Sequence, residues 1–116
     1  MSAWPTSIMT KGDIWVTDLP AKGGHVQRGV RPALIIADAT TSIALVVPIT
    51  SSLAAQRFPH TLCIEPTMSN GLDKQSVLLL FQLGAVDKRF LHHHIGTIDA
   101  ALMQRVDDKL RALIGV

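Results

Sequence analysis

Two apolar runs, Pro32-Ala-Leu-Ile-Ile36 and Ile43-Ala-Leu-Val-Val-Pro-Ile49, are the clearest structural signal in this chain. Both are short and rich in residues that pack well on a pleated sheet, and polar clusters bound them. Pro32 and Pro48 lie close to the ends of the runs, where a strand tolerates a residue without a backbone N–H. We therefore expect two strands, at 32–36 and 43–49.

Three more segments have the same character, namely Ile14–Leu19, Thr61–Ile64 and Val77–Leu83. Five or more short strands separated by turn residues are typical of a small barrel or a compact antiparallel sheet. The chain has 116 residues, which is the size of one domain. We expect a single domain over residues 1–116, with residues 1–10 as a flexible N-terminal extension.

The C-terminal segment carries a helical period instead. Asp99 is placed to cap a helix and Gly115 to end it. Between them, apolar side chains recur at spacings that put them on one face of an amphipathic helix: Leu102, Val106, Leu110 and Leu113. A shorter helical turn is expected within residues 87–94. The predicted fold is therefore mainly β with α (α+β), ending in one amphipathic helix.

The composition excludes several classes of protein. Hydrophobic residues make up 47% of the chain and charged residues 17%, so there is enough apolar surface to offset the entropy lost on folding, and the chain is not disordered. The longest uninterrupted apolar runs have five residues, against the roughly 20 that a membrane-spanning helix needs. The lone cysteine, Cys63, fits a reducing compartment. Since residues 1–10 lack a signal-peptide pattern, we expect a cytoplasmic protein with no membrane association.

The positive charge is concentrated in one part of the sequence. Residues 22–60 carry four basic side chains and one acidic side chain, whereas residues 61–116 carry six of each. The segment Asp18–Arg31 holds three of those four basic residues and three glycines. A loop of this length inside a small domain is usually functional, and a local basic patch suits a polyanion, although an ordinary solvated surface is the alternative. This loop is the first candidate for a binding surface.

Four stretches, taken in order, resemble the MazF/PemK toxins, the endoribonuclease half of type II toxin–antitoxin pairs. They are Lys11-Gly-Asp-Ile-Trp-Val-Thr-Asp-Leu19, Gly29-Val-Arg-Pro-Ala-Leu-Ile-Ile36, Val46-Val-Pro-Ile-Thr50, and Ser76-Val-Leu-Leu-Leu-Phe-Gln82 with Asp87-Lys88. The resemblance runs from about Lys11 to Ile114. It implies an SH3-like barrel with a terminal helix, a homodimer, and an antitoxin that blocks the RNA groove. It also implies cleavage of single-stranded RNA without a metal ion or organic cofactor.

By position, the resemblance assigns the catalytic arginine to Arg31 and the catalytic hydroxyl to Thr50. Arg31 precedes a proline, which favours an extended backbone. Its planar, permanently charged guanidinium suits the phosphoryl oxygens on which negative charge builds during cleavage. The hydroxyl of Thr50, at the end of an apolar run, would hold the phosphate in line for attack. For both residues the alternative is structural: a surface ion pair for Arg31 and turn chemistry for Thr50.

Seven further residues are expected to bind RNA. They carry amide, hydroxyl, guanidinium or imidazole groups: Gln27, Arg28, Ser51, Ser52, Arg57, His60 and Gln82. His60 is of the residue type that transfers protons near neutral pH, and an ordinary surface histidine is the alternative. Phe58 is the one aromatic residue expected in this region, so affinity should depend on charge and polar contacts more than on stacking.

No protein nucleophile or metal-activated water is indicated by the sequence. Cys63 lies between apolar residues and is interpreted as a small buried hydrophobe. The run His92–His94 does not suit one metal ion, because consecutive side chains diverge on a helix and alternate on a strand. The remaining nucleophile is the 2′-hydroxyl of the RNA itself. We therefore expect products with a 2′,3′-cyclic phosphate and a 5′-hydroxyl.

Two positions depart from the pattern of many relatives. Val26 stands where a glutamate is common, and Phe81 stands where a glutamate precedes the residue that matches Gln82. These departures leave the preferred RNA sequence open. Two other functions also remain: a CcdB-type toxin, which shares the barrel but poisons DNA gyrase by binding, and an inactive relative that only binds RNA or an antitoxin. The presence of both Arg31 and Thr50 favours the endoribonuclease.

Overall fold

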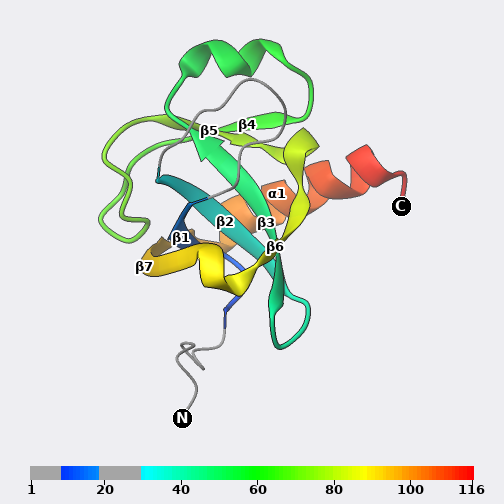
Figure 1. Ribbon diagram of the computed structural model, residues 1–116. Coiled ribbons are helices and arrows are strands. Elements are labelled where there is room, and N and C mark those ends of the chain that lie inside the picture. Colours follow the sequence, from blue (N-terminus) through cyan, green and yellow to red (C-terminus); the bar gives the residue numbers. More distant parts are fainter. Residues whose placement is uncertain (1–8, 19–29) are drawn as a thin grey trace, which may run out of the picture.

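Strands dominate the part of the chain that the computed structural model describes, residues 9–18 and 30–116 (Figure 1). The strands are β1 (Asp13–Thr17), β2 (Arg31–Asp38), β3 (Ile43–Thr50), β4 (Thr61–Ile64), β5 (Ser76–Leu79), β6 (Gly84–Asp87) and β7 (Leu91–Thr97). The helices are α1 (Ala100–Ile114) and the short 3-10 turns η1 (Leu53–Arg57), η2 (Leu80–Gln82) and η3 (Lys88–Phe90). The predicted class, mainly β with one C-terminal helix, is confirmed.

The strands pair antiparallel in the order β4-β5-β3-β2-β1-β7, and β6 also pairs with β3. β3 holds the sheet together, because one end pairs with β5 and the other with β6. Within the described residues β4 and β7, at the two ends of the order, do not pair, so the sheet curves without closing into the expected barrel. The end of β7 is tied instead to the β4–β5 connection, since the Thr97 N–H donates to Ser69 O at 2.8 Å.

Two stretches of secondary structure differ from the sequence prediction. The strand expected at 77–83 ends at Leu79, where the chain turns through η2 before β6. The helical turn expected within residues 87–94 covers only η3, and the three histidines that follow belong to β7. Pairing of β7 with β1 supplies the backbone hydrogen bonds that a helix would otherwise have made. Tertiary pairing therefore decides the conformation here.

Alternating strand residues supply two apolar layers, one on each face of the sheet. One layer lies between the sheet and α1 and contains Leu34, Val47 and Val106. The other contains Trp15, Ala33, Ile35 and Val46 and lies on the opposite side of the same strands, which we call the outer face. In Figure 1, α1 runs behind the sheet. The outer face is thus the one that the helix leaves uncovered.

The C-terminal helix begins and ends as the sequence predicts. The side chain of Asp99 accepts a hydrogen bond from the Leu102 N–H at 2.7 Å. Gly115 takes a left-handed conformation with φ of 79°, and its N–H donates to Arg111 O. Of the predicted apolar stripe, Val106 and Leu110 are buried and the other two members are half-buried. Among the described residues, no helix has the length and apolar character needed to cross a bilayer.

An ion pair fixes the far end of β2. Lys88 donates a hydrogen bond to the carboxylate of Asp38, and this bond lowers the pKa of Asp38 below its usual value. The positive charge of Lys88 also lowers the pKa of Asp38. A carboxylate whose pKa is lowered by folding adds stability above its unfolded pKa, and this is lost as pH falls through the folded value. This ion pair therefore strengthens the fold in neutral solution.

Candidate active site

Arg31 and Thr50 lie on neighbouring strands and on the same face of the sheet. Ala33 pairs with Pro48 and Leu34 with Val47, and this register, continued to the strand ends, sets Arg31 opposite Thr50. Residues that stand directly opposite in an antiparallel pair project to the same side. That side is the outer face, because Arg31 alternates in step with Ala33. The two residues assigned to catalysis by the resemblance thus lie at adjoining ends of the paired strands β2 and β3 and face the same side.

The backbone of Arg31 is held in place at the start of β2. Thr17, fully buried on β1, pairs with Arg31, and its hydroxyl donates to Arg31 O at 3.0 Å. The following Pro32 keeps the backbone of Arg31 extended. The arginine side chain is half-buried, and no ion pair found among the described residues involves it. A guanidinium so placed is available to an anionic ligand.

The hydroxyl of Thr50 accepts one hydrogen bond, from the turn that follows it. Its oxygen accepts the N–H of Ser52 at 3.1 Å, which fixes the oxygen at the start of the turn that leads into η1. The hydroxyl hydrogen remains to be donated outward. Thr50 is half-buried and pairs with Val77 on β5, which holds its backbone at the end of β3. Ser51 and Ser52 are exposed beside it.

The other residues expected to bind RNA fall into three groups. Gln27 and Arg28, like most of the basic loop and Val26, lie outside the described residues. Arg57 and His60 are exposed on the connection between β3 and β4, where His60 has a left-handed backbone with φ of 60°. Gln82 is exposed at the end of η2. Among the described residues, no hydrogen bond joins His60 to Arg31 or Thr50, so its proposed part in proton transfer stays a prediction.

The segment η1 is anchored over β4 and β5. Gln56 Nε2 donates to the sulfur of Cys63 at 2.8 Å, and Thr61 Oγ1 donates to Phe58 O at 3.0 Å. Cys63 is half-buried, whereas the sequence predicted a buried hydrophobe; the amide contact leaves its sulfur at the boundary of the core. These contacts hold the segment that follows Thr50 against β4, which pairs with β5.

Sequence reasoning missed one contact in this region. The rings of Phe58 and Phe81 lie with centroids 5.8 Å apart, and the guanidinium of Arg57 lies 4.9 Å from the centroid of the Phe58 ring. Phe58 was expected near the RNA and Phe81 was noted only as a departure. A contact between two loop residues 23 positions apart leaves no periodic signal in the sequence.

The three consecutive histidines lie on β7, so their side chains alternate between the two faces of the strand. His92, His93 and His94 are all exposed. His94 packs its ring edge-on against Trp15, with centroids 5.9 Å apart, and its Nε2 lies 3.4 Å from Asp13 Oδ1. Within residues 9–18 and 30–116, no three His, Cys, Asp or Glu side chains are clustered so that they could hold a metal ion.

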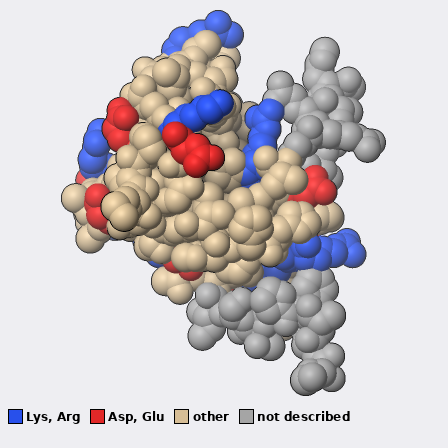
Figure 2. All heavy atoms as spheres, turned by 90° about the vertical axis from the view of Figure 1, so that its left-hand side faces the viewer, with Lys and Arg blue, Asp and Glu red and all other residues tan. Residues whose placement is uncertain are grey.

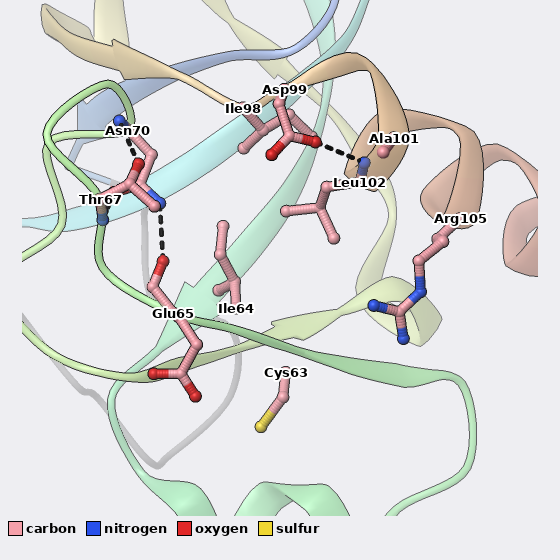
Figure 3. Close-up of a pocket in the computed structure, with 10 residues that line it drawn as sticks. All are labelled: Cys63, Ile64, Glu65, Thr67, Asn70, Ile98, Asp99, Ala101, Leu102 and Arg105. Carbon is pink, nitrogen blue, oxygen red and sulfur yellow. Dashed lines mark hydrogen bonds between the residues drawn. The ribbon is translucent and has the colours of Figure 1, made fainter.

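A shallow pocket of about 300 Å³ lies on the other side of the sheet, between β4 and the start of α1 (Figure 3). Several of its polar groups already bond to one another: Asn70 Nδ2 donates to Glu65 O at 2.8 Å, and Asp99 caps the helix. Because the pocket is lined by residues of the helix-side layer such as Ile64 and Ile98, it is separate from Arg31 and Thr50.

Charge on the surface is dispersed rather than continuous. On the side drawn in Figure 2, basic and acidic side chains of the described residues are interspersed, some of them in contact, in a largely uncharged surface. No single-sign patch covers this side where the chain is described. Arg31, at the start of β2, is a positively charged group placed on the outer face to bind an anion.

Comparison with known proteins shows the family to which the chain belongs. The family model of the PemK-like, MazF-like toxin of type II toxin–antitoxin systems matches residues 10–114. The chain is 32% identical over 108 residues to Endoribonuclease EndoA of Bacillus subtilis (strain 168), covering 90% of this chain and 92% of that protein.

Solved structures share the fold at lower identity. MazE–MazF (Form-II) from Deinococcus radiodurans superposes with a TM-score of 0.75 at 23% identity, covering 95% of this chain and 98% of that one. An endoribonuclease in complex with its cognate antitoxin, from Mycobacterial species, gives 0.67 at 19% identity, covering 91% and 92%. With the sequence match over nearly the whole chain, the conclusion is plain: this protein belongs to the PemK/MazF-like toxins of type II toxin–antitoxin systems.

Proposed function

We propose that this protein is the toxin of a type II toxin–antitoxin pair and cuts single-stranded RNA as an endoribonuclease. The observation that carries the proposal is the placement of Arg31 and Thr50 side by side on the outer face, with a guanidinium free of ion pairs among the described residues and a hydroxyl able to donate. The Bacillus relative, named an endoribonuclease, supports the same activity. A cytoplasmic location is part of the proposal, because the proposed substrate is RNA inside the cell.

The reaction needs only the substrate's own nucleophile. The 2′-oxygen of the nucleotide before the cut bonds to phosphorus as the bond from phosphorus to the 5′-oxygen breaks. The 2′-hydroxyl loses a proton and the 5′-oxygen gains one. Arg31 stabilises the charge that develops on the phosphoryl oxygens, and the Thr50 hydroxyl donates to one of them and holds the phosphate in line. The products are a 2′,3′-cyclic phosphate and a 5′-hydroxyl.

The proposed RNA contacts extend from this centre along the loops that border it. They use groups suited to phosphate or base edges: Gln27, Arg28, Ser51, Ser52, Arg57, His60 and Gln82. An antitoxin protein is the second proposed partner, in keeping with the Mycobacterial complex. Residues 1–116 are proposed to act as one domain.

Replacing Thr50 with valine is expected to slow cleavage roughly tenfold to a hundredfold, because a hydrogen bond to a charged acceptor contributes on the order of 1.5–3 kcal/mol. Valine keeps the branched shape that suits a strand. Thr50→Ser keeps the hydroxyl and should cut RNA within a few-fold of the wild-type rate. Cleavage rates of the two variants on the same RNA decide the matter. Equal cleavage rates for the valine and serine variants would show that the Thr50 hydroxyl takes no part in the reaction.

Cleavage is expected to continue in excess EDTA, since the proposed steps use an arginine, a hydroxyl and the RNA itself. The measurement compares cleavage rates of one RNA with chelator and with added magnesium. Rates that agree within about twofold support the mechanism. Cleavage that disappears with chelator and returns with magnesium would show that a cation takes part.

The protein is expected to be a homodimer. A chain of 116 residues buries only about two-thirds of the surface of its unfolded form, and a 47% hydrophobic composition leaves apolar area for a partner. Light scattering at micromolar protein should give about twice the chain mass of 12.5 kDa. A mass that stays at that of one chain across the concentration range contradicts the prediction.

The gyrase-poisoning alternative is not favoured, because the chain matches the PemK/MazF family model and a relative named an endoribonuclease. A poison that acts by binding would leave purified RNA intact. Incubating the purified protein with single-stranded RNA therefore separates the functions. Cleavage supports the endoribonuclease, and intact RNA supports the gyrase poison or the inactive relative.

A further inference from the structure

Two aromatic side chains stand out on the surface beside the proposed active site. Phe58, just after η1, is 44% exposed, and Phe81, in η2, is 42% exposed. Their rings are 5.8 Å apart at the centroids and tilted by 56°. We call these two residues the aromatic pair. Exposed phenylalanines in contact form an apolar spot that water solvates poorly.

The surroundings of the aromatic pair are cationic and polar. The guanidinium of Arg57 lies 4.9 Å from the Phe58 ring centroid, and Arg57 takes part in no ion pair among the described residues. His60, two residues after Phe58, and Gln82, next to Phe81, are exposed. A small apolar spot beside a cation matches a nucleotide, which carries a flat base and an anionic phosphate. A protein partner would instead need a broader apolar surface.

The strand pairing places the aromatic pair near Thr50. Thr61, whose hydroxyl donates to Phe58 O, stands opposite Leu79 on β5. Val77, two residues away on the same strand, stands opposite Thr50. Two residues of a strand span about 7 Å, and residues 77 and 79 face the same side. Thr61, to which Phe58 is bonded, therefore lies on the same face as Thr50, two strands across and two residues along the sheet.

We propose that Phe58 and Phe81, with Arg57, form a base-stacking subsite that holds a nucleobase flanking the cleaved phosphate. The inference rests on the proposed function and deepens it. The base packs against the exposed ring surface, while Arg57 pairs with a backbone phosphate. Stacking adds affinity with little preference among bases, because every base has a flat aromatic face. The subsite thus fixes where the strand lies relative to Arg31 and Thr50.

The test couples changes in the protein to changes in the RNA. The RNA is a short oligonucleotide spanning a cut site mapped in a digest of total RNA, made with one abasic nucleotide at each flanking position in turn. For the wild type, loss of the stacked base is expected to raise KM about tenfold with little change in kcat. Phe58→Leu and Phe81→Leu should raise KM on intact RNA similarly and show no further rise at that abasic position.

Matched variants keep this test specific. Phe58→Tyr preserves a stacking ring and should retain the abasic penalty. Met68→Ala removes a fully exposed apolar side chain elsewhere and should leave KM unchanged. If the abasic penalty at every position is the same in the leucine variants and the wild type, the subsite does not exist. If the leucine variants instead lose the dimer mass in light scattering, the pair is a contact between copies and the proposal is wrong.

A second readout does not depend on cleavage. The same RNA carries 2-aminopurine at the stacked position and a 2′-deoxy nucleotide at the cut. Its fluorescence should fall on binding the wild type and Phe58→Tyr, and fall much less with Phe58→Leu. A protein that quenches in this way but cuts no RNA would contradict the proposed function alone. The subsite alone would be contradicted if the wild type cuts RNA but shows no fall in fluorescence and the same abasic penalty as the leucine variants.

Discussion

Replacing Arg31 with alanine should lower the rate of RNA cleavage at least about a hundredfold while leaving the fold intact. The guanidinium is the one cationic group seated between the described strands next to Thr50, and removal of a placed donor at a developing anion costs on the order of 3–4 kcal/mol of transition-state stabilisation. Stability should change little, because Arg31 is half-buried and is held through its backbone by Thr17. Cleavage rates and thermal melting of the variant measure both effects.

Two further variants act as controls for that experiment. Arg31→Lys keeps the charge but loses the planar fork, so an intermediate rate is expected. Arg105→Ala removes an exposed arginine of α1, on the helix side of the molecule, and should cut at the wild-type rate. An Arg31→Ala protein that melts like the wild type and still cuts at a near-normal rate would show that Arg31 is not catalytic.

A single 2′-deoxy nucleotide immediately before the cut should lower the cleavage rate at least about a thousandfold, while the affinity for the RNA changes little. The 2′-oxygen is the proposed nucleophile, and an intramolecular nucleophile held in line has an effective concentration on the order of 10⁵ M or more, which no outside group replaces. Binding should persist, because the phosphates and bases that the protein contacts are unchanged. Rates and equilibrium binding are measured on the substituted RNA and on its all-ribose counterpart.

The position of the substitution supplies the control. A 2′-deoxy nucleotide one step after the cut leaves the nucleophile in place and should be tolerated within a few-fold. Loss of cleavage at both positions would indicate a general need for ribose in binding. Normal cleavage with the deoxy nucleotide before the cut would rule out attack by the 2′-hydroxyl.

Periodic segments of the sequence predicted their structures well. The apolar runs at 32–36 and 43–49 became β2 and β3, and Thr61–Ile64 is β4 with the predicted bounds. The helix cap at Asp99 and the stop at Gly115 were also predicted, because both depend on side-chain chemistry local to the helix ends. Local signals of this kind need no knowledge of the rest of the chain.

The segments that the sequence did not predict depend on distant partners. β6 exists because residues 84–87 pair with the start of β3, and β7 because residues 91–97 pair with β1. Neither segment has the apolar period of a strand. That β4 and β7 do not pair likewise depends on where the chain turns. The strand propensity of individual residues does not determine those turns.

The same distinction holds for the proposed site. Arg31 and Thr50 were identified by resemblance, and their juxtaposition follows from the register of β2 with β3. The contact of Phe58 with Phe81 depends on how the segments around η1 and η2 fold over the sheet, so no pattern in the sequence indicates it. Irregular loops bring together side chains that no spacing rule connects.

Analysis of the RNA ends tests the mechanism most directly. Purified protein is incubated with a single-stranded RNA in excess EDTA, and both fragments at one cut are identified by mass spectrometry. We predict a 5′ fragment that ends in a 2′,3′-cyclic phosphate and a 3′ fragment that begins with a free 5′-hydroxyl. A 3′ fragment that begins with a 5′-phosphate would contradict attack by the 2′-hydroxyl and the roles proposed for Arg31 and Thr50.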